Sequence, residues 1–341
     1  MKIQLMGTSL VLAMVLSARA QDKPAVPARA GSDAARHDVP AVPNDLPGHG
    51  LGEHDFLYAG EAKDRKVFII VKSKVVWSYD DPAGKGEISD ATRLSNGNLL
   101  IAHQFAMKLI APDKRVIWNY DAPKGTEIHT AVPIGKEHVL FIQNGDPALL
   151  RVINITTNKI EKEFPLPVKN PKSVHGQFRH ARLTAEGTVV VAHMDLGKVV
   201  EYDSSGKELW SIAAPGAWGV TPLKNGNLLI VDRADVREVN RNHDTVWSCG
   251  KSDIPGYKLT NLQLAWRLPN GNTLINNWVN QWSGPIDPAT APVQAIELSP
   301  DKKVVWALRS WSDPNLGPAT TIQILDDDTQ APENVTFGDF Q

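Results

Sequence analysis

A unit of about eleven residues recurs along this chain and constrains the fold more than any other feature. Each copy is a polar turn followed by a short apolar run that ends on a polar residue. The copies lie at 93–103 (RLSNGNLLIAH), 222–232 (PLKNGNLLIVD) and 267–277 (RLPNGNTLINN), with weaker ones at 133–143 (PIGKEHVLFIQ) and 182–193 (RLTAEGTVVVAH). Asn-Gly favours a two-residue hairpin turn, because both residues tolerate the positive φ that this turn needs. Each copy therefore predicts a β-hairpin.

The spacing of these units predicts a β-propeller. The turn glycines Gly97, Gly187, Gly226 and Gly271 are 90, 39 and 45 residues apart, so the period is about 45 with one weaker copy inside the first interval. That period is typical of four-stranded propeller blades. An aromatic residue in a short strand-like run recurs at Trp77, Trp118, Phe164, Trp210, Trp247 and Trp306, and the last five each follow one of the hairpins. We expect these six runs to be outer strands, with the rings packed between blades rather than against a cofactor.

The two ends of the chain are predicted to complete one blade together. Before Trp77 the sequence has three short strand-like runs, at 56–58, 67–71 and 75–79, and after Trp306 one run remains, at 320–325. Pairing these runs would remove the open sheet edges of both ends. The prediction is an all-β, six-bladed β-propeller of four-stranded antiparallel blades over residues 54–328. A C-terminal tail at 329–341 and an exposed loop at 281–292 complete the domain organisation.

The first 20 residues have the pattern of an export signal: a lysine, an apolar run at 5–16, and small residues at Ala18 and Ala20. The run is too short to cross a bilayer. We therefore expect cleavage after Ala20 and a periplasmic or secreted protein without membrane anchoring. Residues 21–53 are expected to form a disordered linker rich in Pro and Ala. With Cys249 as the single cysteine, we expect a monomer that is stabilised by its core and not by disulfides.

Charge and motifs exclude several functions. The 36 basic and 38 acidic residues give a net charge of −2 and are interspersed, so nucleic acid is not an expected partner. The patterns HExxH, CxxC, CxxCH, GxSxG and the phosphate loop do not occur. We therefore expect no cofactor and assign no metal site.

Alignment of the repeats places polar side chains at equivalent strand ends. The second strands of the blades end on His103, Gln143, His193, Asp232 and Asn277. In a propeller the first strand begins on the face where the second strand ends, so these residues should meet the first-strand starts there. Those starts carry Glu87, Glu127 and His129, then Arg179 or His180, then Trp218 and Gln263. We expect these side chains to converge on one face of the ring, with Trp218 and Trp266 as an apolar platform.

His129 and Glu127 are the candidate catalytic pair. Residues two apart on a strand share a face, so Glu127 would orient the imidazole of His129 and raise its pKa by stabilising the charged form. His180 is a second candidate, because the repeat leaves open whether His180 or Arg179 takes the place of His129. The alternative for His129 is a hydrogen-bonded plug that closes the channel.

The segment 268–275 (LPNGNTLI), with AIEL at 295–298 and KVVW at 303–306, resembles blades of arylsulfotransferase-like and quinoprotein-like propellers. The resemblance spans most of residues 67–310. It implies a six-bladed periplasmic propeller in which a histidine on the axis passes a sulfuryl group from one phenol to another. The chain lacks room for the additional N-terminal domain of the large periplasmic members, and no catalytic histidine motif matches residue by residue. Quinoprotein dehydrogenases usually have eight blades, so the resemblance does not imply pyrroloquinoline quinone.

Three functions remain open from the sequence. The first is binding of a small polar or carbohydrate ligand in a histidine-rich central funnel. The second is an enzyme at the same funnel, by arylsulfotransferase-like transfer through a histidine or by proton abstraction from an acidic sugar, with Arg179 neutralising its carboxylate. The third is a protein-interaction scaffold that uses the rim and the loop at 281–292.

Overall fold

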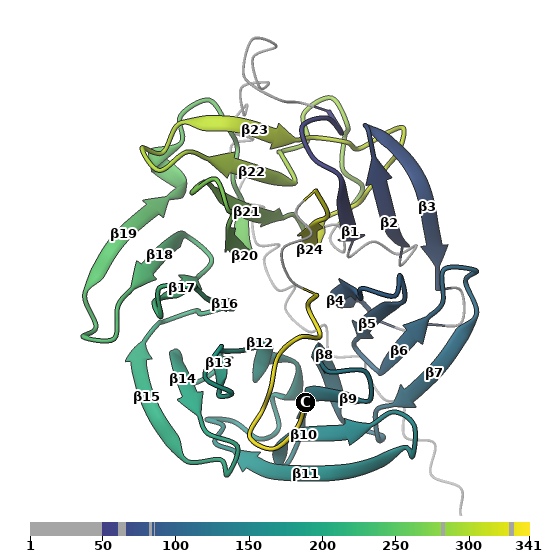
Figure 1. Ribbon diagram of the computed structural model, residues 1–341. Coiled ribbons are helices and arrows are strands. Elements are labelled where there is room, and N and C mark those ends of the chain that lie inside the picture. Colours follow the sequence, from purple (N-terminus) through teal and green to yellow (C-terminus); the bar gives the residue numbers. More distant parts are fainter. Residues whose placement is uncertain (1–49, 61–65, 82–83, 85, 281–283, 327–330) are drawn as a thin grey trace, which may run out of the picture. The chain divides into compact units, whose positions relative to one another are not determined.

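Six four-stranded antiparallel sheets form a closed ring (Figure 1). The computed structural model describes residues 50–60, 66–81, 84, 86–280, 284–326 and 331–341, all of which belong to one unit. The innermost strand of each sheet contacts the innermost strands of both neighbouring sheets, so the six blades share one axis. The predicted six-bladed β-propeller is confirmed. The predicted signal peptide at 1–20 and residues 21–49 of the predicted linker lie outside the described residues.

Five blades are continuous in sequence and begin with their innermost strand. Blade 2 comprises β4 (Ile88–Arg93), β5 (Leu99–His103), β6 (Ala106–Ile110) and β7 (Val116–Asp121). Blade 3 comprises β8 (Glu127–Ile134), β9 (His138–Asn144), β10 (Ala148–Asn154) and β11 (Lys159–Leu166). Blade 4 comprises β12 (Phe178–Leu183), β13 (Val189–His193), β14 (Lys198–Tyr202) and β15 (Glu208–Ala213). Blade 5 comprises β16 (Gly219–Pro222), β17 (Leu228–Val231), β18 (Asp235–Val239) and β19 (Thr245–Gly250). Blade 6 comprises β20 (Asn261–Arg267), β21 (Thr273–Trp278), β22 (Ala295–Leu298) and β23 (Val304–Leu308).

Blade 1 is built from both ends of the chain, as predicted. Its order is β24 (Ala319–Ile324), β1 (Phe56–Gly60), β2 (Lys66–Val71) and β3 (Lys74–Asp80). The innermost strand β24 pairs antiparallel with β1, with Ile322 opposite Tyr58. The phenol of Tyr58 donates a hydrogen bond to the carbonyl oxygen of Gly317 at 2.5 Å. The C-terminal strand therefore closes the ring and covers the edge that β1 would otherwise leave unpaired.

The Asn-Gly hairpins are present, but their turn differs from the predicted one. Gly97, Gly226 and Gly271 have φ values of 84°, 83° and 86°, whereas the asparagines before them do not have positive φ. Each asparagine instead accepts a hydrogen bond on its side-chain oxygen from the backbone N–H two residues later, at 2.9–3.0 Å. That bond holds the asparagine in a right-handed turn, and glycine alone takes the left-handed conformation. The predicted turn with two positive φ values is therefore wrong.

Each of the six interfaces between blades has its own apolar core. The marker tryptophans lie at these interfaces, and four of them donate an indole N–H to the outer turn of the next blade. The bonds run from Trp77 to Pro112 (2.8 Å), Trp118 to Asn158 (3.2 Å), Trp210 to Arg241 (3.1 Å) and Trp247 to Pro300 (3.3 Å). The rings thus pack between blades, as the sequence predicts, and at four of the six interfaces an indole N–H ties one blade to the next.

The described part of the C-terminal tail, residues 331–341, lies across the hairpin turns of blades 2, 3 and 4; it is yellow in Figure 1. The Glu333 carboxylate accepts a hydrogen bond from the backbone N–H of Ser95 at 3.0 Å, and its carbonyl oxygen accepts one from Gly135 at 2.8 Å. Phe337 is fully buried in the core between blades 3 and 4. The described part of the tail is therefore packed against the propeller at the end of the axis where these hairpin turns lie.

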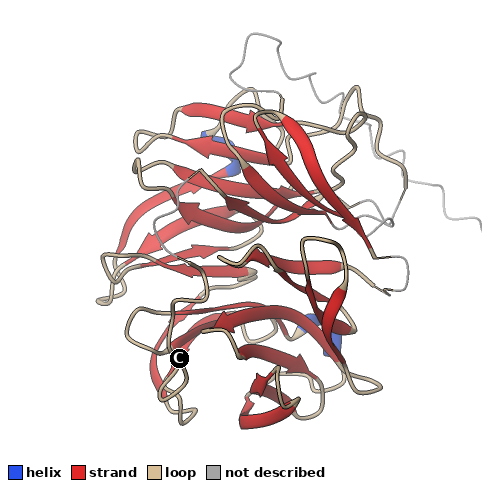
Figure 2. Ribbon diagram, turned by 45° about the vertical axis from the view of Figure 1, so that its right-hand side comes forward, coloured by secondary structure: helices blue, strands red, loops and turns tan. Residues whose placement is uncertain are grey.

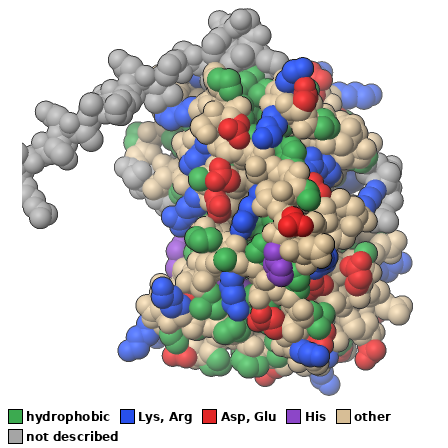
Figure 3. All heavy atoms as spheres, turned by 90° about the vertical axis from the view of Figure 1, so that its left-hand side faces the viewer, with side chains coloured by type: hydrophobic (Ala, Val, Ile, Leu, Met, Phe, Trp, Pro, Cys, Tyr) green, Lys and Arg blue, Asp and Glu red, His purple; other side chains and the backbone are tan. Residues whose placement is uncertain are grey.

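Strands dominate the described residues, and the two short 3₁₀ helices are Val174–Gly176 and Lys251–Asp253 (Figure 2). No helix in this part of the chain is long and apolar enough to cross a bilayer. Cys249 is buried and forms no disulfide, and burial raises the pKa of its thiol to about 11. Acidic and basic side chains are interspersed on the face shown in Figure 3, without a patch of one sign.

Candidate functional site

A β-bulge near the start of the innermost strands sets the geometry of the axis. It occurs in β4, β8, β12 and β20, where one extra residue is inserted against the second strand. After the bulge, Ala91, Ala131, Ala181 and Ala265 occupy the same register position. Such bulges re-aim the neighbouring side chains, here toward the axis. Counting back from these alanines aligns the blades by their hydrogen-bond pairing.

This alignment gives a ring of six residues, one from each blade, which we call the first ring. It consists of Ser89, His129, Arg179, Trp218, Gln263 and Thr320. A cavity of about 10 Å³ lies between Ser89, Arg179, Trp218, Gln263 and Thr320, with Glu87 and His180. Arg179 therefore occupies the place of His129 in blade 4, which settles the alternative that the sequence left open.

His129 lies between two carboxylates at the start of the axis. Its Nδ1 is 3.1 Å from the nearer Glu87 oxygen, and its Nε2 is 2.9 Å from the nearer Glu127 oxygen. The hydroxyl of Ser89 is 2.9 Å from Nδ1. A doubly protonated ring can donate to both carboxylates, which is the arrangement of a charge-assisted network. Because the His129 side chain is 1% exposed, its ring nitrogens face protein and not solvent.

His175 is the solvent-facing histidine of this group. It lies in the short helix Val174–Gly176, before β12, and its side chain is 54% exposed. Its Nδ1 is 2.8 Å from the Glu127 oxygen that also contacts His129. Gln104 donates its amide N–H to the other Glu127 oxygen at 2.8 Å. Glu127 therefore holds two imidazoles and one amide in fixed positions.

Two arginines place positive charge beside Trp218. The guanidinium carbon of Arg179 is 5.0 Å from the centre of the Trp218 ring, and that of Arg233 is 5.1 Å from it. Both distances are typical of cation–π contacts. Arg179 also approaches His175, with its Nη2 2.7 Å from Nε2, and Glu87 at 3.7 Å. Arg179 is buried whereas Arg233 is exposed to solvent. One of the two cations beside Trp218 is therefore enclosed by protein, and the other lies at the protein surface.

The carboxylates of this group are held in their ionised form. Burial raises the pKa of Glu87, but the hydrogen bond from His129 and the charges of His129 and Arg179 outweigh it and lower the pKa to about 2. Burial likewise raises the pKa of Glu127, but hydrogen bonds from His129, His175 and Gln104 hold it well below its usual range. Both glutamates are therefore anions at neutral pH.

A second ring closes the axis beneath the first. Asp90, Thr130, His180 and Thr321 occupy it, and all four are buried. Asp90 accepts hydrogen bonds from Thr130 at 3.1 Å and Thr321 at 3.2 Å, and both of its oxygens pair with Arg182, at 2.8 and 3.0 Å. Burial lowers the pKa of His180, whose Nδ1 is 3.8 Å from Asp90. His180 thus lies inside a paired, buried layer.

Glu87, His129 and His175 could together hold a metal ion, since one ligand atom of each lies within 4.8 Å of the others. The guanidinium of Arg179, however, already contacts both His175 and Glu87. A divalent cation would have to displace this fixed positive charge or lie beside it, which is electrostatically unfavourable. The arrangement therefore suits a resident guanidinium better than a metal.

The predicted second-strand ends do not join this group. His103 lies 3.5 Å from Asp81, next to the Lys108–Asp81 pair. Gln143 accepts a hydrogen bond from Arg151, His193 bonds to the Tyr202 phenol, Asp232 caps its own turn, and Asn277 bonds to the backbone at Thr260 and Val293. Burial lowers the pKa of His193 to about 3. Each of these side chains thus has a partner of its own: His103 contacts Asp81 at the end of blade 1, and the other four bond within their own blade or turn.

Trp266 also lies elsewhere, so the expectation that it joins Trp218 at one funnel is wrong. Trp218 comes directly before β16, whereas Trp266 is near the end of β20. The innermost strands run from one end of the axis to the other, so the indoles of Trp218 and Trp266 line different cavities at opposite ends. The residues that sequence reasoning missed are Gln104, His175 and Arg233. Gln104 and Arg233 each follow a predicted strand end by one residue, so a shift of one position would have found them.

No protein-family model matches the chain, and no curated protein matches it. Among solved structures, a protein of unknown function from Bacteroides caccae is 24% identical, with a TM-score of 0.69 over 81% of this chain and 100% of its own. Virginiamycin B lyase from Staphylococcus aureus is 13% identical, with a TM-score of 0.51 over 75% of this chain and 85% of its own. The WD40 propeller domain of Doa1 is 14% identical, with a TM-score of 0.50 over 65% and 71%.

These likenesses show the fold alone. They support a β-propeller repeat protein, in agreement with the repeat period. They do not confirm the arylsulfotransferase-like assignment.

Proposed function

We propose that the chain binds a small polar molecule with a negatively charged group, such as a sugar acid. The binding site is the mouth site, defined here as Glu127, His175, Arg179, Trp218 and Arg233. The observation that carries the proposal is the pair of guanidinium groups over the ring of Trp218. In the described part of the chain, Arg233 forms no ion pair with a carboxylate, so its charge is available to a ligand.

The charge of the mouth site favours an acidic ligand over a neutral sugar. A neutral sugar needs a free aromatic face and several hydrogen-bonding groups. The Trp218 ring already carries two cations, so it holds the arginines instead of offering an open platform. A guanidinium matches a carboxylate with two parallel hydrogen bonds. Of the ligands left open by the sequence, the acidic carbohydrate therefore fits best.

Calorimetric titration with D-galacturonate and D-galactose tests this proposal, because the two sugars differ by one carboxylate. The wild type should bind galacturonate and show no heat with galactose. Arg233→Gln should weaken galacturonate binding roughly ten-fold or more, the effect of losing a charged hydrogen bond. Arg115→Gln is the matched control, since Arg115 pairs with Asp113 on an outer turn. Equal binding of both sugars, or unchanged affinity in Arg233→Gln, would refute the proposal.

Proton abstraction from the bound acid is a second candidate function, favoured by the contacts of His175. Arg179 can only donate, so its contact with Nε2 assigns the lone pair to Nε2 and the proton to Nδ1, which faces Glu127. A ligand carboxylate that takes Arg179 would free the Nε2 lone pair to remove the proton on the carbon next to the ligand carboxylate. The glycosidic C–O bond on the adjacent carbon would break as the double bond forms, and the sugar would leave as an alcohol by taking a proton from water. Glu127 would then stabilise the imidazolium that forms. His129, with both nitrogens engaged, would position Glu127 and not contact the ligand.

The test of this second function is the appearance of a conjugated product by ultraviolet absorbance when the protein is incubated with oligogalacturonate. His175→Ala should abolish the signal while galacturonate still binds. His243→Ala is the matched control, because His243 is stacked on Trp210 at the outer side of blade 4. Binding without turnover in the wild type would leave the chain a binding protein and exclude the enzymatic function for this substrate.

A further inference from the structure

A cavity of about 270 Å³ lies at the end of the axis opposite the mouth site. It is formed where the innermost strands end, and every blade lines it with the residue at one shared register position. These residues, which we call the fourth ring, are Thr92, Val132, Arg182, Thr221, Trp266 and Gln323. Like the mouth site, this cavity lies at an end of the axis, and all six blades contribute to it.

Two buried layers separate the cavity from the mouth site. One is the ring around Asp90, whose carboxylate is paired by Arg182 and hydroxyl groups. The other is a layer of small and apolar side chains that are at most 4% exposed: Ala91, Ala131, Ala181, Val220, Ala265 and Ile322. A ligand in the cavity therefore cannot reach the mouth site, and the two ends can bind different molecules.

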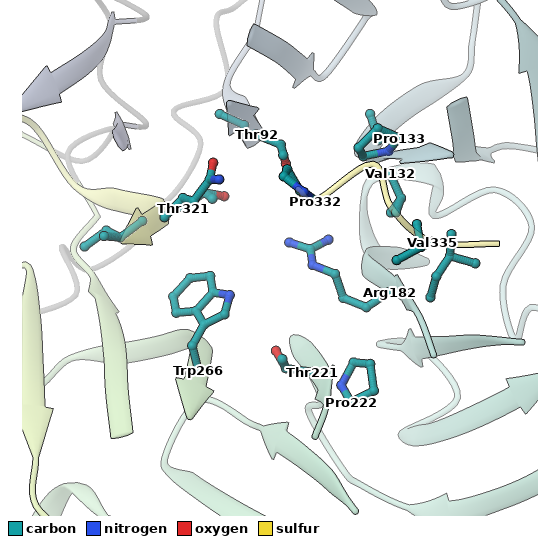
Figure 4. Close-up of a pocket in the computed structure, with 15 residues that line it drawn as sticks. Thr92, Val132, Pro133, Arg182, Thr221, Pro222, Trp266, Thr321, Pro332 and Val335 are labelled. Carbon is teal, nitrogen blue, oxygen red and sulfur yellow. The ribbon is translucent and has the colours of Figure 1, made fainter. Parts of the chain in front are cut away.

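Trp266, Arg182 and Thr221 surround the same space (Figure 4). The edge of the Arg182 guanidinium is fixed by both oxygens of Asp90, so its charge is balanced and its flat face can stack on a ring. Trp266 supplies an aromatic surface across the cavity. The hydroxyl of Thr221 is buried and has no hydrogen-bond partner among the described residues. An unpartnered buried hydroxyl is costly unless a bound molecule completes it.

The C-terminal tail forms part of the wall of the cavity. Pro332 and Val335 line it, and the intervening Glu333 fixes the tail to Ser95 and Gly135. Apolar groups from Val132, Leu183 and Pro222 complete the lining. The cavity is therefore mainly apolar, with a balanced ion pair at its base and one hydroxyl to satisfy.

We propose that this cavity is a second binding site and that it takes a flat, neutral aromatic molecule with one hydrogen-bonding group. The ring of the ligand would lie between Trp266 and the guanidinium of Arg182, and its polar group would bond to Thr221. Because the Arg182 charge is already paired, the site selects against the acidic ligand proposed for the mouth site. Its volume lies just below the usual range of ligand pockets, so a compact one- or two-ring ligand fits.

Titration of indole into the protein tests this site, since indole is flat, neutral and carries one N–H donor. Thr221→Val preserves the shape and removes the hydroxyl, and it should weaken indole binding roughly five-fold, the effect of one neutral hydrogen bond. Trp266→Leu should weaken it about ten-fold or more through the loss of ring stacking. Thr245→Val, on the exposed outer strand β19, is the matched control and should bind as the wild type does.

Three results would overturn the proposal: no indole binding up to its solubility limit, wild-type affinity in both Thr221→Val and Trp266→Leu, or loss of indole binding in Arg233→Gln. The last result would place indole at the mouth site instead. Melting temperatures of the variants establish that each is folded. The indole titration contains no galacturonate, so this proposal can fail while the proposed function of the mouth site stands, and the reverse.

Discussion

His54 supports the closure of the ring, because it links the two chain segments that form blade 1 to each other and to blade 6. Its Nδ1 is 2.8 Å from Asp326, which follows β24, and its Nε2 is 2.7 Å from Glu297 on β22. The ring also packs edge-on against Trp306, with centroids 5.3 Å apart. The hydrogen bond to Glu297 raises the pKa of His54, burial opposes this, and Asp326 raises it further. The protonated form of His54 is therefore the one that bonds most strongly to Glu297 and Asp326.

Substitution His54→Gln should lower the free energy of unfolding by about 2 kcal/mol at pH 6. Two charged hydrogen bonds are worth about 1.5–3 kcal/mol each in buried settings, but Asp326 is 37% exposed and solvent screens its share. Glu297 keeps its bond from Asn272 at 2.6 Å, so the glutamate is not left without a partner. For a domain of this size the loss corresponds to a fall in Tm of about 5 °C.

The pH dependence separates the charge of His54 from its packing. Because the folded pKa is raised, the stability from this group is fully present below the unfolded pKa of 6.5 and is lost as the pH rises through the folded pKa. The difference in Tm between wild type and His54→Gln should therefore shrink as the pH rises from 6 to about 9. Thermal unfolding by circular dichroism measures it. An equal difference at both pH values, or none at pH 6, would refute the reasoning.

Two further predictions concern the hairpin turns and the buried ion pair at the axis. Gly226→Ala should lower the free energy of unfolding by about 1 kcal/mol in urea denaturation, because φ is 83° and no atom lies within 4 Å of an added Cβ, so that only backbone strain acts. Gly284→Ala is the control and should be neutral, since Gly284 is also in open space but has no positive φ. Equal effects of the two substitutions would contradict this reasoning. Asp90→Ala should cost about 3–5 kcal/mol, because it leaves the Arg182 guanidinium without its buried carboxylate, and a loss below about 1 kcal/mol in the same assay would mean that this pair does not hold the axis together.

The repeat explains why the fold could be predicted from the sequence. Turn glycines such as Gly97 and marker rings such as Trp77 recur once per blade, so period and count follow from chain positions alone. The closure by β24 follows because the first blade lacks an innermost strand. The type of turn was missed because it depends on a local bond, from the asparagine side chain to the backbone, that competes with the two-residue turn.

The candidate site could be predicted only in part, for a related reason. Glu87, Glu127 and His129 lie on repeated strand positions, so alignment brings them together. His175 comes from a loop outside the repeat, and no period places it, whereas Arg233 lies one residue beyond the strand end that the alignment marks. Trp266 was assigned to the wrong end because its place along β20, and not its residue type, decides which end it faces. Sequence repeats thus define the frame of the axis, while the connecting loops supply its exposed chemistry.

A crystal structure of the protein soaked with D-galacturonate tests the central claim most directly. The mouth site should hold the sugar acid with its carboxylate against the guanidinium groups of Arg179 and Arg233 and with His175 within hydrogen-bond distance of the ligand. A sugar acid bound elsewhere on the protein, or a mouth site that holds only water at saturating galacturonate, would contradict the account.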